Sequence, residues 1–166
     1  WSSVQTFTTA CSPVTTFSEN FDSYTATGSA NPLPSCWTRA GNGSTYITTG
    51  GAVPGTPPNR LYMFANGTAT TPTESIAIMP SVSNLSAETH RLKFRAYASA
   101  ANKTIEIGYF GDASDLSTYI PLQVIDILTT TAATAAVYTY IPVGVPSGIT
   151  SFAFKNAGLP ASTTIY

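Results

Sequence analysis

FSENFD at Phe17–Asp22 and LPSCWT at Leu33–Thr38 are the two stretches that decide how this chain is interpreted. In the first, apolar and polar residues alternate, which predicts a strand over Phe17–Phe21 with both aromatic rings on one side. In the second, prolines precede a tryptophan that opens a new strand. A cysteine, Cys11 or Cys36, lies ahead of the aromatic residues of each stretch. Together they predict the opening of an exported β-sandwich held by a disulfide, which favours a surface-binding module over an enzyme.

The composition narrows the class of protein further. The chain has 166 residues, enough for one domain with a sizeable core. Only 9% of residues are charged, against about 25% in ordinary soluble domains, and the chain has 18 Ser and 27 Thr. In the densest basic stretch, Arg91–Arg95, basic residues alternate with apolar ones, as they do where one face of a strand is exposed to solvent. We therefore expect no nucleic-acid partner, and no apolar run is long enough to span a membrane.

The two cysteines leave two interpretations open. Free thiols would be unremarkable in a cytosolic protein, but a chain rich in Ser and Thr and poor in Lys and Glu is typical of exported proteins, where Cys11 and Cys36 would form a disulfide. A bridge closing a loop of this length stabilises the fold by about 3 kcal/mol. Structural zinc needs four ligands, so two Cys and one His make a zinc site improbable.

Short strand-like runs recur along the chain, and Gly, Pro and Asn turns separate most of them. No segment shows a convincing helical period. This pattern predicts an all-β fold, an antiparallel sandwich or barrel. The predicted strands are Phe17–Phe21, Thr45–Thr49, Arg60–Ala65, Ser75–Met79, Arg91–Ala98, Thr104–Phe110, Ile120–Leu128, Val137–Ile141 and Thr150–Lys155, with Thr163–Tyr166 as the start of another.

Several segments from Cys11 onward resemble the jelly-roll domains called cleaved adhesin or choice-of-anchor J domains. These relatives of MAM domains occur in gingipain haemagglutinin regions and in large surface proteins of type IX-secreting bacteria. The matching segments are Phe17–Ser23, Leu33–Thr38, Pro58–Met63, Ile105–Tyr119 and Phe152–Asn156. The resemblance implies an all-β, antiparallel two-sheet jelly-roll sandwich, located extracellularly or at the cell surface, in a tandem array with neighbouring modules of the same polypeptide.

The resemblance also bears on the two ends. Trp1–Ala10 resembles the last strand of a fibronectin type III module, so we expect residues 1–10 to be the tail of a preceding module and residues 11–166 to be the jelly-roll domain. The alternative is that this strand belongs to the sandwich itself. Domains of the family usually end in a strand like IYIDDV, whereas this chain has Ile165-Tyr166 there. We therefore expect residues 11–166 to lack the last strand.

A structural Ca²⁺ near the first and last strands is a further implication of the resemblance. Calcium takes six to eight oxygen ligands, and Glu19, Asp22 and Asn59 are the residues that could supply some of them. The alternative is that Asp22 begins a turn while Glu19 makes a local hydrogen bond.

No set of residues predicts catalysis. The cluster Asp112–Asp115 lacks the rest of a calcium-loop motif, and we expect Asp115 to cap a short helical turn. His90 is the single histidine, and no GxSxG elbow accompanies it. Closely spaced carboxylates of the kind that glycosidases use are also missing.

Tyr138 and Tyr140 are the candidate ligand-binding residues, because alternate residues share one face of a strand. If that face is outward, the rings could stack on sugars; if it is inward, they belong to the core. The expected function is that of a non-catalytic adhesion module that binds a surface polysaccharide or glycoprotein, or that serves as a stalk repeat. The alternative is a carbohydrate-binding module appended to a secreted hydrolase.

Overall fold

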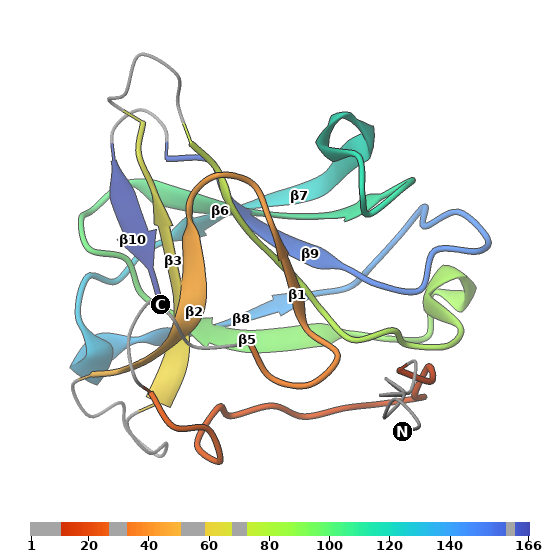
Figure 1. Ribbon diagram of the computed structural model, residues 1–166, viewed down its shortest axis with the longest axis horizontal. Coiled ribbons are helices and arrows are strands. Elements are labelled where there is room, and N and C mark those ends of the chain that lie inside the picture. The colour runs from red at the N-terminus through yellow and green to blue at the C-terminus, as the bar shows by residue number, and fades with distance from the viewer. Residues whose placement is uncertain (1–10, 27–32, 51–58, 68–72, 159–161) are drawn as a thin grey trace, which may run out of the picture.

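The computed structural model describes residues 11–26, 33–50, 59–67, 73–158 and 162–166, and in these residues the chain is a β-sandwich (Figure 1). The expected tail at residues 1–10 lies outside the described residues. None of the described segments forms a helix long and apolar enough to cross a membrane. The strands are β1 Thr38–Ala40, β2 Ser44–Thr49, β3 Asn59–Ala65, β4 Ser75–Ile78, β5 Leu92–Ala96, β6 Lys103–Phe110, β7 Tyr119–Ile127, β8 Ala136–Tyr140, β9 Ala153–Asn156 and β10 Thr163–Ile165. Three short 3₁₀ helices connect them: η1 Leu85–Ala87, η2 Leu116–Thr118 and η3 Ala132–Thr134.

One layer is a five-stranded sheet with the order β1-β4-β9-β6-β7. Every pairing in it is antiparallel, and the β6–β7 register shifts once, between Ile107 and Gly108. Neighbours in space are therefore mostly distant in sequence, as in a jelly roll.

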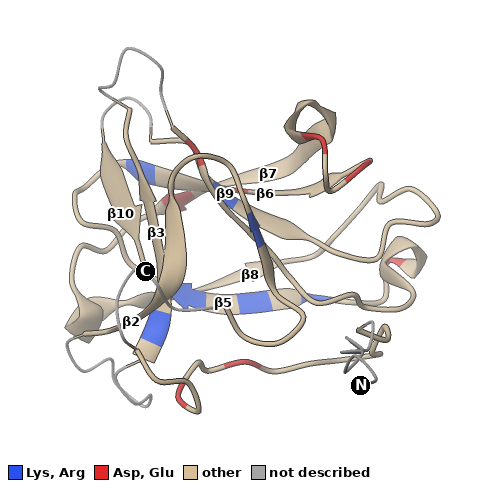
Figure 2. Cartoon of the chain, viewed as in Figure 1, with Lys and Arg blue, Asp and Glu red and all other residues tan. Residues whose placement is uncertain are grey.

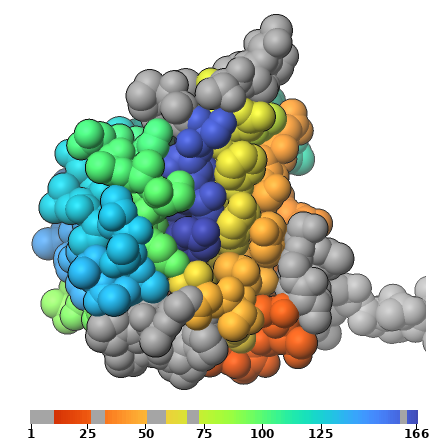
Figure 3. All heavy atoms as spheres, turned by 90° about the vertical axis from the view of Figure 1, so that its left-hand side faces the viewer, coloured from red at the N-terminus to blue at the C-terminus, as the bar shows by residue number. Residues whose placement is uncertain are grey.

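The other layer combines the β10-β3-β2 sheet with the β5-β8 pair. Tyr97, just after β5, and Tyr166, just after β10, exchange backbone hydrogen bonds of 3.1 and 2.9 Å. Ala98 bridges Ile165 next to them. Figure 3 shows the C-terminal residues as a blue column between the yellow of β3 and the green of the residues after β5. The order of this layer is thus β2-β3-β10-β5-β8, and β10 is an interior strand.

The hydrophobic core lies between the two layers. Alternate residues of β2 and β3 are buried, as a two-residue period requires. Ile47, Met63 and Ile165 from one layer and Ile107 and Ile127 from the other are at most 2% exposed. The predicted all-β, antiparallel two-sheet sandwich is therefore confirmed.

The predicted strand at Phe17–Phe21 is wrong, whereas each of the other predicted runs overlaps a strand. The Glu19 carboxylate accepts the backbone N–H of Phe21 at 2.6 Å, and Phe21 has a φ of 65°. A φ of 65° lies outside the extended region of the backbone. The alternation in this stretch instead reflects a shared contact, since the rings of Phe17 and Phe21 pack edge-on against Trp37 with centroids 6.2 and 5.6 Å away.

The predicted disulfide is confirmed. Cys11 and Cys36 are bonded, with their Cα atoms 5.6 Å apart. The bridge fixes the N-terminal segment beside Trp37, the residue on which the two phenylalanine rings pack.

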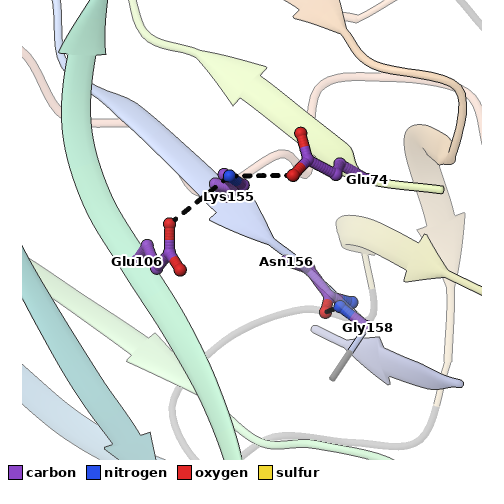
Figure 4. A network of polar contacts seen from close by, with 5 residues as sticks. All are labelled: Glu74, Glu106, Lys155, Asn156 and Gly158. Atoms are coloured by element: carbon purple, nitrogen blue, oxygen red, sulfur yellow. Dashed lines mark hydrogen bonds and ion pairs between the residues drawn. The ribbon is translucent and has the colours of Figure 1, made fainter. Parts of the chain in front are cut away.

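A buried asparagine joins the two layers at one corner (Figure 4). Asn156, on β9, is 0% exposed, and its Nδ2 donates to the carbonyls of Met63 and Thr163 at 2.8 and 3.1 Å. Its Oδ1 accepts the backbone N–H of Gly158 at 3.0 Å. One side chain thereby ties β9 of the first layer to β3 and β10 of the second.

The neighbouring Lys155 points to the opposite face of β9. Its Nζ lies 2.9 Å from Glu74 and 3.7 Å from Glu106 (Figure 4). The same Nζ lies 4.8 Å from the ring centre of Tyr119. Tyr119 Oη is buried and has no hydrogen-bond partner in the described part of the chain. Burial first, and then the charges of Glu106 and Glu74, raise the pKa of Tyr119.

Candidate functional site

The predicted cation ligands lie where the N-terminal segment meets the start of β3. Asn59 Nδ2 donates to the Tyr24 carbonyl at 2.6 Å, and Asn59 Oδ1 accepts from Thr49 Oγ1 at 3.2 Å. Glu19 Oε2 accepts from Tyr24 Oη at 3.3 Å. Burial, and then the Glu19 carboxylate, raise the pKa of Tyr24. Tyr24 therefore connects Glu19 to Asn59 through its side chain and its main chain.

Asp22 is the predicted cation ligand whose side chain has no hydrogen-bond partner among the described residues. Both of its carboxylate oxygens are out of contact with solvent, and neither has a hydrogen-bond partner among the described residues. A buried carboxylate is normally hydrogen-bonded, paired or bound to a metal, because an isolated buried charge is costly. Both features of the simpler alternative are present, the Glu19 hydrogen bond and a turn at Asp22, where the Tyr24 N–H donates to the Phe21 carbonyl at 3.4 Å. The turn alone leaves the two Asp22 carboxylate oxygens without hydrogen-bond partners among the described residues.

The residues present fit a hard cation in part. Asp22 offers two oxygens, while the oxygens of Glu19 and Asn59 already accept hydrogen bonds and retain further lone pairs. The described residues contain no group of three or more His, Cys, Asp and Glu side chains placed to hold a metal. A calcium ion at this point would need oxygens from other groups to reach its usual six to eight.

A cavity of about 410 Å³ adjoins this segment. Its walls come from the N-terminal segment, Trp37, β3 and β5, and its floor is the core side chains Ile105, Phe152 and Phe154. The sequence contained no sign of this cavity, because it depends on the spacing of two strands far apart in the chain.

Tyr138 and Tyr140 share one face of β8, and that face is inward. Tyr140 is 8% exposed and packs edge-on against Phe152, with centroids 6.3 Å apart. The Tyr138 ring stacks on Phe94 at 5.5 Å, and its hydroxyl accepts the backbone N–H of Leu128 at 2.9 Å. Both rings thus pack inward, as the core alternative predicts.

Both tyrosines nevertheless contribute to a shallow cleft of about 520 Å³ between β7 and β8. These are the end strands of their sheets. Exposed apolar side chains lie on these strands and just beyond their ends: Ile120, Val124, Leu128, Val137, Ile141 and Val143. Of these, Ile141 and Val143 line the cleft. The sequence does not reveal the cleft, because it depends on how two strands of different sheets lie side by side. Exposed apolar surface of this kind marks interaction sites.

The other predicted polar residues have structural roles. Asp115 is the N-cap of η2 and accepts the Ser117 N–H at 2.9 Å, which confirms the predicted cap. Hydrogen bonds from Ser114 lower the pKa of Asp112. His90 Nε2 lies 3.0 Å from the Thr15 carbonyl, so the histidine contacts the N-terminal segment.

Comparison with known proteins identifies the fold. No family model matches the chain, and no curated protein matches it. The K2 cleaved adhesin domain of Lys-gingipain is similar in structure, with a TM-score of 0.63 at 14% identity over 90% of this chain and 94% of that domain. Part of the enzymatically active domain of tailspike protein 4 from bacteriophage CBA120 matches at a TM-score of 0.40 and 16% identity, over 80% of this chain and 18% of that one, which is too distant to inform function. The chain is thus a β-sandwich that resembles a cleaved adhesin domain.

Proposed function

We propose that this chain is a non-catalytic adhesion module of a larger exported surface protein. The observation that carries the proposal is the structural match to a cleaved adhesin domain over nearly the whole of both chains. Because that likeness establishes the fold alone, the function is an argument by analogy. The Cys11–Cys36 disulfide supports an oxidising, extracellular location.

The cleft between β7 and β8 is the ligand site that we propose for this module. It combines the apolar side chains of Ile141 and Val143 with edges of Tyr138 and Tyr140. Apolar surface beside hydroxyl groups suits a surface polysaccharide or glycoprotein glycan, whose sugar rings have apolar faces and hydroxyl rims.

A glycan array with the purified chain tests this function, followed by titration of the best ligand against an Ile141→Ser/Val143→Ser variant. We expect the affinity to fall about tenfold, a loss of about 1.4 kcal/mol. Val14→Ser, which changes an exposed apolar side chain outside the cleft, is the matched control. Binding that the double variant leaves unchanged would place the glycan elsewhere. Hydrolysis of any glycan or peptide by the pure chain would contradict the proposal.

A carbohydrate-binding module of a secreted hydrolase is the second candidate, and the same cleft supports it. The array separates the two, because such a module should select one polysaccharide class that matches its partner enzyme. A chain that binds no glycan would instead be a spacer between neighbouring modules.

We also propose that Glu19, Asp22 and Asn59 take part in a structural Ca²⁺ site. Its support is the pair of buried Asp22 oxygens, for which the described residues supply no hydrogen-bond partner. Calcium would neutralise that carboxylate and fix the N-terminal segment against β3.

A further inference from the structure

The outer face of the β5–β8 pair carries a row of positive charge. Arg91, Lys93 and Arg95 are alternate residues on β5 and just before it, and all three are exposed. Their neighbours Leu92 and Phe94 pack against the core, as the two-residue period of a strand requires. The row holds three of the seven Lys and Arg residues of the chain. Figure 2 shows it as a line of blue along β5.

No carboxylate of the described residues pairs with this row. None of its three side chains forms an ion pair there, and the paired strand β8 has no acidic residue. The Arg95 guanidinium donates to the Ala135 carbonyl at 3.4 Å, which is an uncharged partner. Glu88, the acidic residue nearest to the row in sequence, accepts the backbone N–H of Gly144 at 2.8 Å. The charge of the row is therefore available to a ligand.

The paired strand supplies a second row beside the cations. In the β5–β8 register, Lys93 lies opposite Thr139. Arg95 lies opposite Val137, so the side chains of both pairs share the outer face. Thr139 is exposed and Val137 is 48% exposed. Because Thr139 also lines the β7–β8 cleft, the cations lie one strand away from the site proposed for a glycan.

The shape of the row indicates the kind of anion that it fits. Five strand residues span about 14 Å, which matches a linear polyanion better than a single phosphate or carboxylate. A duplex nucleic acid needs a more basic surface than that of a chain with a net charge of −1, and a single strand needs exposed rings on which its bases stack. The aromatic side chains of β5 and β8 pack inward instead: Phe94, Tyr138 and Tyr140.

We propose that the outer face of β5 and β8 binds an acidic polysaccharide, a chain whose sugar units carry carboxylate or sulfate groups. Arg91, Lys93 and Arg95 contact the charged groups, while Val137 and Thr139 contact the apolar faces and hydroxyl groups of the sugars. This inference rests on the proposed function for the choice of a glycan, but its site is the β5 row rather than the β7–β8 cleft.

Polygalacturonate and heparin are the probes, the first for carboxylate and the second for sulfate groups. We expect the purified chain to bind at least one of them, and to bind it about tenfold more weakly when NaCl rises from about 50 to about 200 mM, because salt screens exposed charges. Fully methyl-esterified polygalacturonate has the same backbone without charge and should bind at least about tenfold more weakly than the charged polymer that binds. Binding to neither probe, or equal binding of the esterified polymer, would overturn the proposal.

Charge reversal on β5 locates the site. Lys93→Glu should weaken binding of the charged polymer about tenfold and make it less sensitive to salt. Lys93→Gln, which removes the charge without reversing it, should have a smaller effect in the same direction. Arg39→Glu is the matched control, because it changes the net charge as Lys93→Glu does, at an exposed arginine on β1 of the other layer, and it should leave binding nearly unchanged. Equal losses from Lys93→Glu and Arg39→Glu would overturn the site.

The outcomes separate this inference from the proposed function. A neutral glycan whose binding depends on the Ile141→Ser/Val143→Ser variant but not on Lys93→Glu would support the cleft and overturn the acidic ligand. An acidic polysaccharide whose binding depends on Lys93 but not on the cleft residues would support the β5 row and overturn the cleft. Single-stranded DNA or polyglutamate that binds as tightly as the polysaccharides, with the same dependence on Lys93, would overturn the choice of a glycan.

Discussion

The corner around Asn156 and the segment around Asp22 each contain a buried polar side chain, but they differ in whether that side chain is hydrogen-bonded. Every donor and acceptor that Asn156 uses there has a main-chain partner, at 2.8, 3.1 and 3.0 Å. Neither oxygen of Asp22 has a partner among the described residues. A satisfied polar network specifies one arrangement of its surroundings, whereas an unsatisfied charge opposes burial.

This difference shows in which region the described residues satisfy their buried polar groups and in which they do not. The Asn156 corner needs nothing beyond the chain itself, because three strands supply its partners. The Asp22 segment adjoins the cavity between β3 and β5, and its carboxylate favours a cation. The proposed cation thus lies beside this cavity, apart from the β7–β8 cleft proposed for a glycan.

The largest effect on the free energy of unfolding is expected at the corner around Asn156. Asn156→Ala would remove three hydrogen bonds at a position with 0% exposure, and it would take from the Gly158 N–H the acceptor that it has there. We expect the free energy of unfolding to fall by about 4 kcal/mol, since each lost hydrogen bond contributes about 0.5–1.5 kcal/mol and a buried group left unsatisfied costs about 1–3 kcal/mol. Urea unfolding measures it, and the exposed Gln123→Ala variant should stay within about 0.5 kcal/mol of the parent. A loss below about 1 kcal/mol would show that the corner does not depend on this side chain.

Removing the disulfide tests how strongly it holds the segment around Asp22 in place. The Cys11→Ser/Cys36→Ser variant should lose about 3 kcal/mol of stability, while its far-ultraviolet circular dichroism stays unchanged, because the bridge acts mainly on the unfolded chain. The loss should be smaller in chelator than in calcium, because a released segment lets Asp22 reach water. Equal losses in both would mean that the bridge and Asp22 are independent.

The contrast also shows what the sequence could predict. Strand-like runs separated by turn residues predicted β2 to β9, and the order of the motifs predicted the jelly roll. Alternation failed at Phe17–Phe21, where it reflects two rings on Trp37 rather than strand pairing. It also could not say which face of β8 carries Tyr138 and Tyr140. The partners of Asn156 and the isolation of Asp22 depend on strands distant in sequence, so no local pattern contains them.

Calcium should stabilise the parent chain but not the Asp22→Asn variant. Free Ca²⁺ at a hundredfold excess over Kd should stabilise the parent chain by about 2.7 kcal/mol. Asp22→Asn should remove that gain, and in chelator it should be more stable than the parent, because the uncompensated charge is gone. Thermal melts with and without calcium measure both effects, with the exposed Asp126→Asn as control. A parent melting curve that does not move with calcium contradicts the site.

Tyr119 is the neutral counterpart of Asp22, because its buried hydroxyl also has no hydrogen-bond partner in the described part of the chain but carries no charge. Tyr119→Phe removes the orphaned hydroxyl and keeps the ring over Lys155, so we expect a gain of about 1 kcal/mol at neutral pH. Burial raises the pKa of Tyr119, so the folded state keeps a proton that the unfolded chain releases near pH 10. The stabilisation linked to that proton is complete below this pH and declines above it, because the unfolded state then binds fewer protons. The advantage of Tyr119→Phe over the parent chain should therefore widen between pH 9 and about pH 11 in urea unfolding. A constant difference across that range would show that the hydroxyl reaches solvent, and the contrast with Asp22 would then rest on charge alone.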